Sequence, residues 1–174
     1  MTLNEEINEQ FTGLILLTGT DKAGITSALF ETLSPFSISI LDVEQLVISD
    51  RLILTVLIAL NPSHQKAIEA DLEECASANE VDIATLFASR PLLSVKTPLI
   101  DVVINSDKLH PKSIAEVTKV LANAAGNIES ISRVSSGPLS ICFTISGVNL
   151  DEISKLLTSI TFEDGSQLSV KAHG

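Results

Sequence analysis

The stretch LILLTGTDKAGITSALFETL, residues Leu14 to Leu33, decides how the rest of the chain is organised. A short apolar strand, Leu14 to Leu17, leads into a turn that ends at Gly24, and an amphipathic helix follows. Glycine can take a positive φ and lets a ligand approach the backbone closely. The first N–H groups of a helix lack partners within the helix and lie at the positive end of its dipole. This order predicts a pocket for a small anionic group, although such turns are also common connectors that bind nothing.

The composition is that of a packed globular protein. The chain has 174 residues, of which 45% are hydrophobic and 19% charged, enough for one average domain or two small ones. Its net charge is −11, and it has no Trp and no Tyr. An acidic chain without basic patches or stacking aromatic side chains is a poor candidate for binding nucleic acid or an anionic membrane surface.

Three further features predict a cytoplasmic protein. The longest apolar run, Leu52 to Leu60, is too short to span a bilayer, which needs about 20 residues. Residues 1–10 are acidic and lack the apolar centre of a signal peptide. Cys75 and Cys142 are far apart in a chain that can fold without disulfides, so we expect free, buried thiols in a reducing compartment.

Hydrophobic periodicity and turn residues divide the chain into two similar halves. The first half is predicted as strand, helix, strand, strand, helix, strand over residues 13–18, 25–35, 38–48, 52–60, a helix capped by Asn61, and 81–87. The second half repeats this order over residues 100–104, 111–125, 127–134, 139–145, a helix capped by Asn149, and 167–171. Asp21-Lys22 recurs as Asp107-Lys108, 86 positions later (107 minus 21), and half the chain is 87 residues. Such self-similarity indicates a duplication.

The sequence therefore predicts an α+β fold made of two ferredoxin-like βαββαβ domains, each a four-stranded antiparallel sheet with two helices on one face. The expected boundaries are an acidic tail at 1–10, a first domain at 11–88, a linker at 89–98 that contains Pro91 and Pro98, and a second domain at 99–174. Units of this size have thin cores, and the strand 52–60 is apolar at nearly every position. We therefore expect a homodimer.

A duplicated βαββαβ unit whose first strand ends in D-x-x-G at a helix start resembles the ACT domain, a family of small amino-acid-sensing modules. Within that family, the chain is similar to the tandem ACT region that precedes the catalytic domain of some bacterial, actinobacterial-type phosphoserine phosphatases. The matching segments are TGTDKAGITSALFETLS (18–34), LDVEQLVISDRL (41–52) and, more loosely, NIESISR (127–133).

This resemblance implies that a free amino acid, serine or glycine, binds between ACT domains paired across a homodimer. The turn from Asp21 to Gly24, with Ile25 after it, matches the positions that bind the ligand carboxylate through backbone N–H groups. Asp42 and Asn127 match the positions that hold the amino or side-chain end. Asp21 can also be an ordinary turn or helix-cap residue, so both interpretations stay open.

The second half departs from the family pattern at the matching loop. Residues 107–112 read DKLHPK, without a glycine, and Pro111 removes a backbone donor. A complete ligand site is therefore not expected at this loop. His110 borders it and is a candidate ligand contact, whereas His64 and His173 are expected to have ordinary surface roles.

The chain lacks the chemistry of an enzyme. Phosphatases of the resembling class carry D-x-D-x-T, but no Asp-x-Asp occurs in this sequence. No Cys/His cluster has metal-ligand spacing, so no cofactor is expected in this chain, and Mg²⁺ only in an absent phosphatase domain. Two hypotheses follow: an amino-acid-sensing regulatory region of a phosphoserine phosphatase of L-serine biosynthesis, or a free-standing tandem ACT regulator similar to the glycine cleavage system transcriptional repressor.

Overall fold

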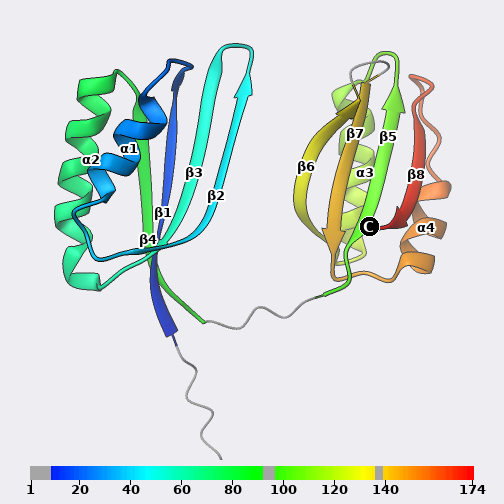
Figure 1. Cartoon of the computed structure of the whole chain (residues 1–174). Helices are drawn as coiled ribbons and strands as arrows, with labels where there is room; N and C mark the ends of the chain where they lie inside the picture. The colour runs from blue at the N-terminus through cyan, green and yellow to red at the C-terminus, as the bar shows by residue number, and fades with distance from the viewer. Residues whose placement is uncertain (1–8, 92–96, 136–138) are drawn as a thin grey trace, which may run out of the picture. The chain divides into compact units, whose positions relative to one another are not determined.

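The structure, a computed structural model, describes residues 9–91, 97–135 and 139–174. The chain divides into two compact units, residues 1–94 and 95–174. In each unit, Figure 1 shows helices packed against a twisted sheet. No helix in the described part of the chain is long and apolar enough to cross a membrane.

The first unit alternates strands and helices in the predicted order. Its elements are β1 (Glu9–Thr20), α1 (Ile25–Leu33), β2 (Ser39–Ile48), β3 (Arg51–Ala59), the short 3₁₀ helix η1 (Pro62–His64), α2 (Gln65–Asn79) and β4 (Asp82–Pro91). The strands lie in the order β2-β3-β1-β4, and all neighbours are antiparallel. β2 and β4 are therefore the two edges of this sheet.

The second unit repeats this architecture. Its elements are β5 (Ile100–Ser106), α3 (Pro111–Asn123), β6 (Asn127–Ser135), β7 (Leu139–Ser146), α4 (Leu150–Thr158) and β8 (Gln167–Ala172), with strand order β6-β7-β5-β8. The register of the second strand shifts at matching places, between Ile40 and Asp42 in one unit and between Ile128 and Ser130 in the other. The predicted fold, two ferredoxin-like βαββαβ units in tandem, is confirmed.

Each sheet buries one face under its two helices. In the central strand β3, Leu52, Leu54, Val56 and Ile58 are fully buried, while the residues between them are partly exposed. This period of two places one row of side chains against α1 and α2. The helices contribute three buried residues each to this core: Ile25, Leu29 and Leu33 from α1, and Ile68, Leu72 and Cys75 from α2. Cys75 and Cys142 are both buried and free, as expected.

Two asparagines start helices as predicted. The Oδ1 atom of Asn61 accepts a hydrogen bond from the Ser63 N–H at 2.9 Å, and that of Asn149 accepts one from the Asp151 N–H at 2.9 Å. Each side chain satisfies a backbone donor that has no partner within its helix.

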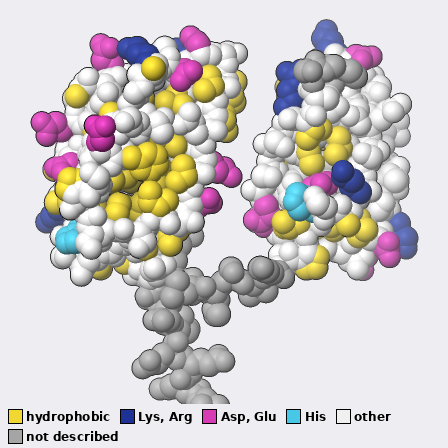
Figure 2. Space-filling model, viewed as in Figure 1, with side chains coloured by type: hydrophobic (Ala, Val, Ile, Leu, Met, Phe, Trp, Pro, Cys, Tyr) yellow, Lys and Arg dark blue, Asp and Glu magenta, His cyan; other side chains and the backbone are white. Residues whose placement is uncertain are grey.

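The edge strand β2 is exposed along its whole length. Its large apolar side chains are 43% to 59% exposed: Ile40, Leu41, Val43, Leu46, Val47 and Ile48. In the view of Figure 2, hydrophobic side chains gather in a broad patch on the first unit. The apolar run 52–60, one motive for expecting a homodimer, forms the central strand β3, whose alternate side chains are buried. The exposed apolar strand is β2.

The strands β1 and β4 are longer than predicted. β1 begins at Glu9, inside the expected acidic tail, and β4 runs to Pro91, inside the expected linker. Glu9 pairs with Pro91 and Phe11 with Ser89, so the start of β1 and the end of β4 extend each other as paired strands. A proline is tolerated there because β4 is an edge strand. Residues 92–96 of the expected linker and 136–138 of the expected turn lie outside the described residues.

Candidate functional site

The start of α1 has the geometry that the sequence predicts for an anion-accepting turn. Gly24 occupies the N-cap position with φ 95°, and no side chain among the described residues caps this helix. The Ala28 N–H donates to the Gly24 carbonyl at 2.9 Å, and the Ile25 N–H reaches the Lys22 carbonyl only at 3.5 Å. A Cβ placed on Gly24 would have no atom of the described structure within 4 Å. The helix start is thus open to a ligand.

The loop before α1 is fixed by its backbone and leaves its side chains exposed. The Asp21 N–H donates to the Asp50 carbonyl at 2.8 Å, which ties the loop to the β2–β3 turn. Ser49 and Asp50 in that turn both have positive φ, as a two-residue hairpin requires. Lys22 Nζ lies 3.1 Å from Glu80 Oε2, with both side chains more than half exposed. The Asp21 carboxylate therefore lies at the surface beside the helix start.

Ile25 anchors the helix start rather than facing a ligand with its side chain. The residue is only 4% exposed and packs in the core of the first unit. If Ile25 contacts a ligand, only its backbone is available for that contact.

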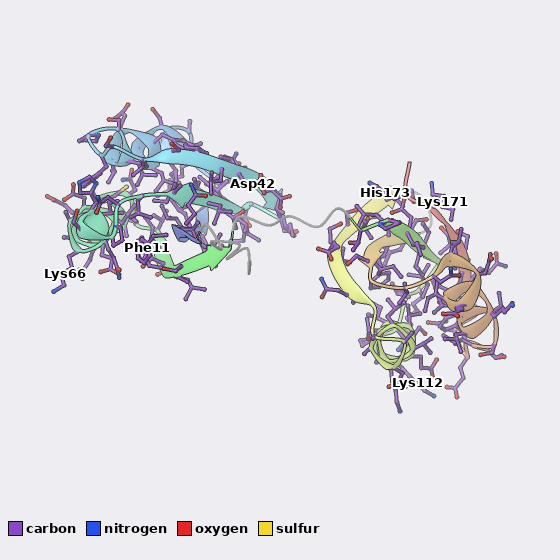
Figure 3. The ribbon with its side chains drawn as sticks, turned by 90° about the horizontal axis from the view of Figure 1, so that it is seen from below. Phe11, Asp42, Lys66, Lys112, Lys171 and His173 are labelled. Atoms are coloured by element: carbon purple, nitrogen blue, oxygen red, sulfur yellow. The ribbon has the colours of Figure 1, made fainter. Side chains whose placement is uncertain are left out.

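Asp42 lies far from this loop within one copy of the chain. It pairs with Leu57, which pairs with Leu14, six residues before Thr20 at the end of β1. At about 3.3 Å per residue, the separation along the sheet is roughly 20 Å. Asp42 Oδ1 accepts a hydrogen bond from the Val43 N–H at 2.9 Å. Figure 3 shows Asp42 at the edge of the first unit, on the opposite side from Lys66 of α2.

Asn127 belongs to the second unit and makes contacts of its own. Its Nδ2 atom donates to Glu129 Oε1 at 2.7 Å, and the Ser146 hydroxyl donates to the same oxygen. Both hydrogen bonds lower the pKa of Glu129, and the one from Ser146 has the larger effect. Asn127 precedes the register shift of β6 whereas Asp42 follows that of β2, so the two residues occupy different positions in their units.

A polar cluster on the open face of the second sheet was missed by the sequence reasoning. Asp101 in β5 is 7% exposed, and its Oδ1 atom lies 2.8 Å from His173 Nδ1 and 3.0 Å from the Thr144 hydroxyl. The His173 N–H also donates to the Leu99 carbonyl at 3.0 Å. Figure 3 labels His173 next to Lys171 of β8. The sequence did contain a sign of this cluster: an aspartate within the apolar strand 100–104. A buried carboxylate needs a hydrogen-bonding partner, so Asp101 could have been expected to have one.

The described residues contain no group of three or more His, Cys, Asp or Glu side chains that could hold a metal ion. The groups exposed at the start of α1 are the backbone of the helix start and the side chain of Asp21.

Comparison with known proteins agrees with the fold. Residues 12–85 match a family model described as the ACT domain. The first unit is an ACT domain. The second unit has the same topology: its strands follow the same order, and α3 and α4 occupy the places of α1 and α2 in the chain order. The ACT match covers the whole of the loop from Asp21 to Gly24 and the residue Asp42.

Two curated phosphoserine phosphatases are similar to nearly the whole chain. The enzyme of Streptomyces coelicolor is 25% identical over 176 residues, and phosphoserine phosphatase SerB2 of Mycobacterium tuberculosis is 27% identical over 167 residues; each match covers 92% of this chain. The chain spans only about two fifths of their length, 40% and 41% respectively.

Two solved structures share the fold of both units. A protein of unknown function from Galdieria sulphuraria superposes with a TM-score of 0.75 over 95% of this chain and 99% of its own, at 18% identity. A putative glycine cleavage system transcriptional repressor superposes with a TM-score of 0.72 over 95% and 98%, also at 18% identity. At this identity the likeness shows the fold.

Proposed function

We propose that this chain is the amino-acid-sensing regulatory region of a phosphoserine phosphatase of L-serine biosynthesis, whose catalytic domain lies outside the 174 residues. The similarity to two such phosphatases over 92% of the chain supports this proposal. The single structural observation that carries it is the uncapped start of α1 at Gly24, open to solvent in an ACT domain.

The ligand in this proposal is a small free amino acid, serine or glycine. Its carboxylate accepts hydrogen bonds from the first N–H groups of α1, those of Thr26 and Ser27, which point out of the helix start. The positive φ of Gly24 leaves the approach to these donors unobstructed. The nearby Asp21 carboxylate suits the ammonium group of the same ligand, since an amino acid carries both charges.

We further propose that the chain is a homodimer and that the ligand lies between two copies. The exposed apolar strand β2 is an unpaired sheet edge, which proteins ordinarily cover. If two β2 edges pair antiparallel, the Asp42 end of one strand lies beside the Ile48 end of the other. Ile48 pairs with Arg51, which pairs with Thr20 directly before the ligand loop. This arrangement supports a role for the partner subunit's Asp42 at the amino end of the ligand.

Catalysis and cofactors belong outside this chain in the proposal. The sequence lacks the D-x-D-x-T nucleophile motif, so Mg²⁺ and phosphate-ester hydrolysis are assigned to a catalytic domain. The two buried, free cysteines support a reducing compartment, and we place the protein in the cytoplasm.

The second candidate is a free-standing tandem ACT regulator, similar to the putative glycine cleavage system transcriptional repressor. The superposition over 95% of this chain and 98% of that chain supports this candidate through the shared fold. The candidates differ in whether the natural reading frame continues past Gly174 into D-x-D-x-T, and sequencing through the gene separates them.

A titration of the ¹⁵N-labelled chain with serine and then glycine tests the ligand site. We expect saturable shifts of the amide signals of Gly24, Thr26 and Ser27. Ligand at 100 times its Kd should raise stability by about 2.7 kcal/mol, seen as a higher melting temperature. Absence of any shift at millimolar amino acid would contradict the proposal.

The matched variants are Gly24→Ala and Gly165→Ala. Both glycines have positive φ, 95° and 73°, and neither has an atom within 4 Å of an added Cβ. Each variant therefore carries similar backbone strain, about 1–2 kcal/mol. We expect Gly24→Ala to lose binding and Gly165→Ala to keep it. Equal binding by both variants would move the site away from α1.

A further inference from the structure

The start of α3 in the second unit is occupied by a carboxylate of the chain itself. Asp164, in the loop between α4 and β8, accepts hydrogen bonds at Oδ2 from the Ser113 hydroxyl at 2.6 Å and from the His110 N–H at 3.2 Å. Its other oxygen, Oδ1, accepts one from the Ser166 N–H at 3.0 Å. His110 is the N-cap of α3 and Ser113 lies in its first turn. The carboxylate thus lies where an anionic ligand would meet this helix.

Two backbone donors of this helix start are already used, and a third is missing. Pro111 has no N–H, the Ser113 N–H donates to the His110 carbonyl at 3.0 Å, and the His110 N–H donates to Asp164. These contacts, led by the Ser113 hydroxyl, hold the pKa of Asp164 far below its usual range, so the group is ionised at neutral pH. A small hollow of about 220 Å³ beside it is also lined by Lys112, which pairs with Glu163 at 2.9 Å.

The described part of the first unit has no counterpart of this contact. No side chain among the described residues caps α1. The difference follows from loop length: residues 80–81 join α2 to β4, whereas residues 159–166 join α4 to β8. Among the described residues, only the longer loop places a carboxylate on a backbone N–H of the preceding helix start. In the short loop, Glu80 instead pairs with the exposed Lys22.

We propose that Asp164 is an internal occupant of the α3 helix start, which keeps free carboxylates out of the second unit. Its consequence for stoichiometry rests on the proposed function: if an amino acid binds at α1, the chain takes one such ligand and not two. The duplication has then produced one sensing unit and one unit closed by its own side chain.

Acetate tests the proposal as a probe of free carboxylate binding. The full chain and its Asp164→Ala variant are labelled with ¹⁵N and titrated with sodium acetate against sodium chloride of equal ionic strength. We expect the Asp164→Ala variant to melt a few degrees lower than wild type. Acetate should then shift its His110 and Ser113 amide signals saturably and restore part of the lost melting temperature. The same signals of wild type should not respond.

The control is Asp151→Ala, which removes another aspartate from the first turn of a helix in the same unit. It should not make α3 respond to acetate. If Asp164→Ala does not fold, Asp164→Ser replaces it, because serine can still close the turn at Ser166 but is too short to reach Ser113.

Two outcomes overturn the proposal: a folded Asp164 variant whose α3 signals ignore acetate, or a wild-type chain whose α3 signals respond to it. Both are read at His110 and Ser113, so they are independent of serine binding at Gly24. A failure of serine to bind at α1 would contradict the proposed function and leave the role of Asp164 standing.

Discussion

Phe87 occupies the space where a side chain on Gly13 would begin: a Cβ built on Gly13 would lie 2.5 Å from Cε1 of the Phe87 ring. The ring is stacked on Phe11, with centroids 6.2 Å apart and an interplanar angle of 11°. Gly13 lies in β1 and Phe87 opposite it in β4, so the glycine lets a large ring lie flat over the sheet.

Gly13→Ala is therefore expected to destabilise the first unit. Alanine in a strand gains about 0.5–1 kcal/mol over glycine in chain entropy, but overpacking costs typically 1–3 kcal/mol, and the second effect should win. Urea unfolding measures the difference. In a Phe87→Ala background the same change should cost little, because the obstructing ring is gone; an equal cost in both backgrounds would rule out this contact as the cause.

The hydrogen bonds of Asp101 are expected to stabilise the fold by an amount that depends on pH. Burial by itself raises its pKa, but hydrogen bonds from His173 and Thr144 and the charge of His173 outweigh it and lower the pKa overall. A folded-state pKa below the unfolded value of about 3.9 means that the stabilisation is present above about pH 4 and is lost as the pH falls through the folded pKa.

The corresponding test compares wild type with Asp101→Asn in urea melts from about pH 6 down to about pH 2. The variant should be less stable than wild type at pH 6, and the gap should narrow on acidification. Asp71→Asn, at an exposed position of α2, is the control and should differ little from wild type throughout. A gap for Asp101→Asn that stays constant with pH would contradict the assignment.

The exposed edge strand β2 is the proposed contact surface of the homodimer, so a charge placed on it should separate the two copies. Val47→Lys places a charge on the apolar edge that is proposed to pair with a second copy, and should give a monomer of 18.5 kDa in sedimentation. Leu86→Lys is the matched control, since Leu86 is 57% exposed on the other edge strand, β4. It should leave the dimer intact. A wild-type chain that is already monomeric at micromolar concentration would exclude the homodimer.

Much of the fold was predictable because it depends on local patterns. Alternating apolar residues in 52–60 and helical spacing in α1 identify which faces are buried, and these patterns need only neighbouring residues. Asn61 and Asn149 start helices through bonds to donors two residues away. The open helix start at Gly24 was likewise predicted from the residue types, although its positive φ became visible only in the structure.

The contacts that distinguish the two units could not be derived in this way. Asp164 reaches His110 and Ser113 across more than 50 residues, and His173 reaches Asp101 across 72. Asp42 and Thr20, the last residue of β1 before the loop, are 22 positions apart in sequence and lie roughly 20 Å apart along the sheet. Sequence periodicity determined the elements and their buried faces, because each depends on neighbouring residues. Tertiary structure alone showed that Asp164 fills the start of α3, because that contact depends on a distant loop long enough to reach it.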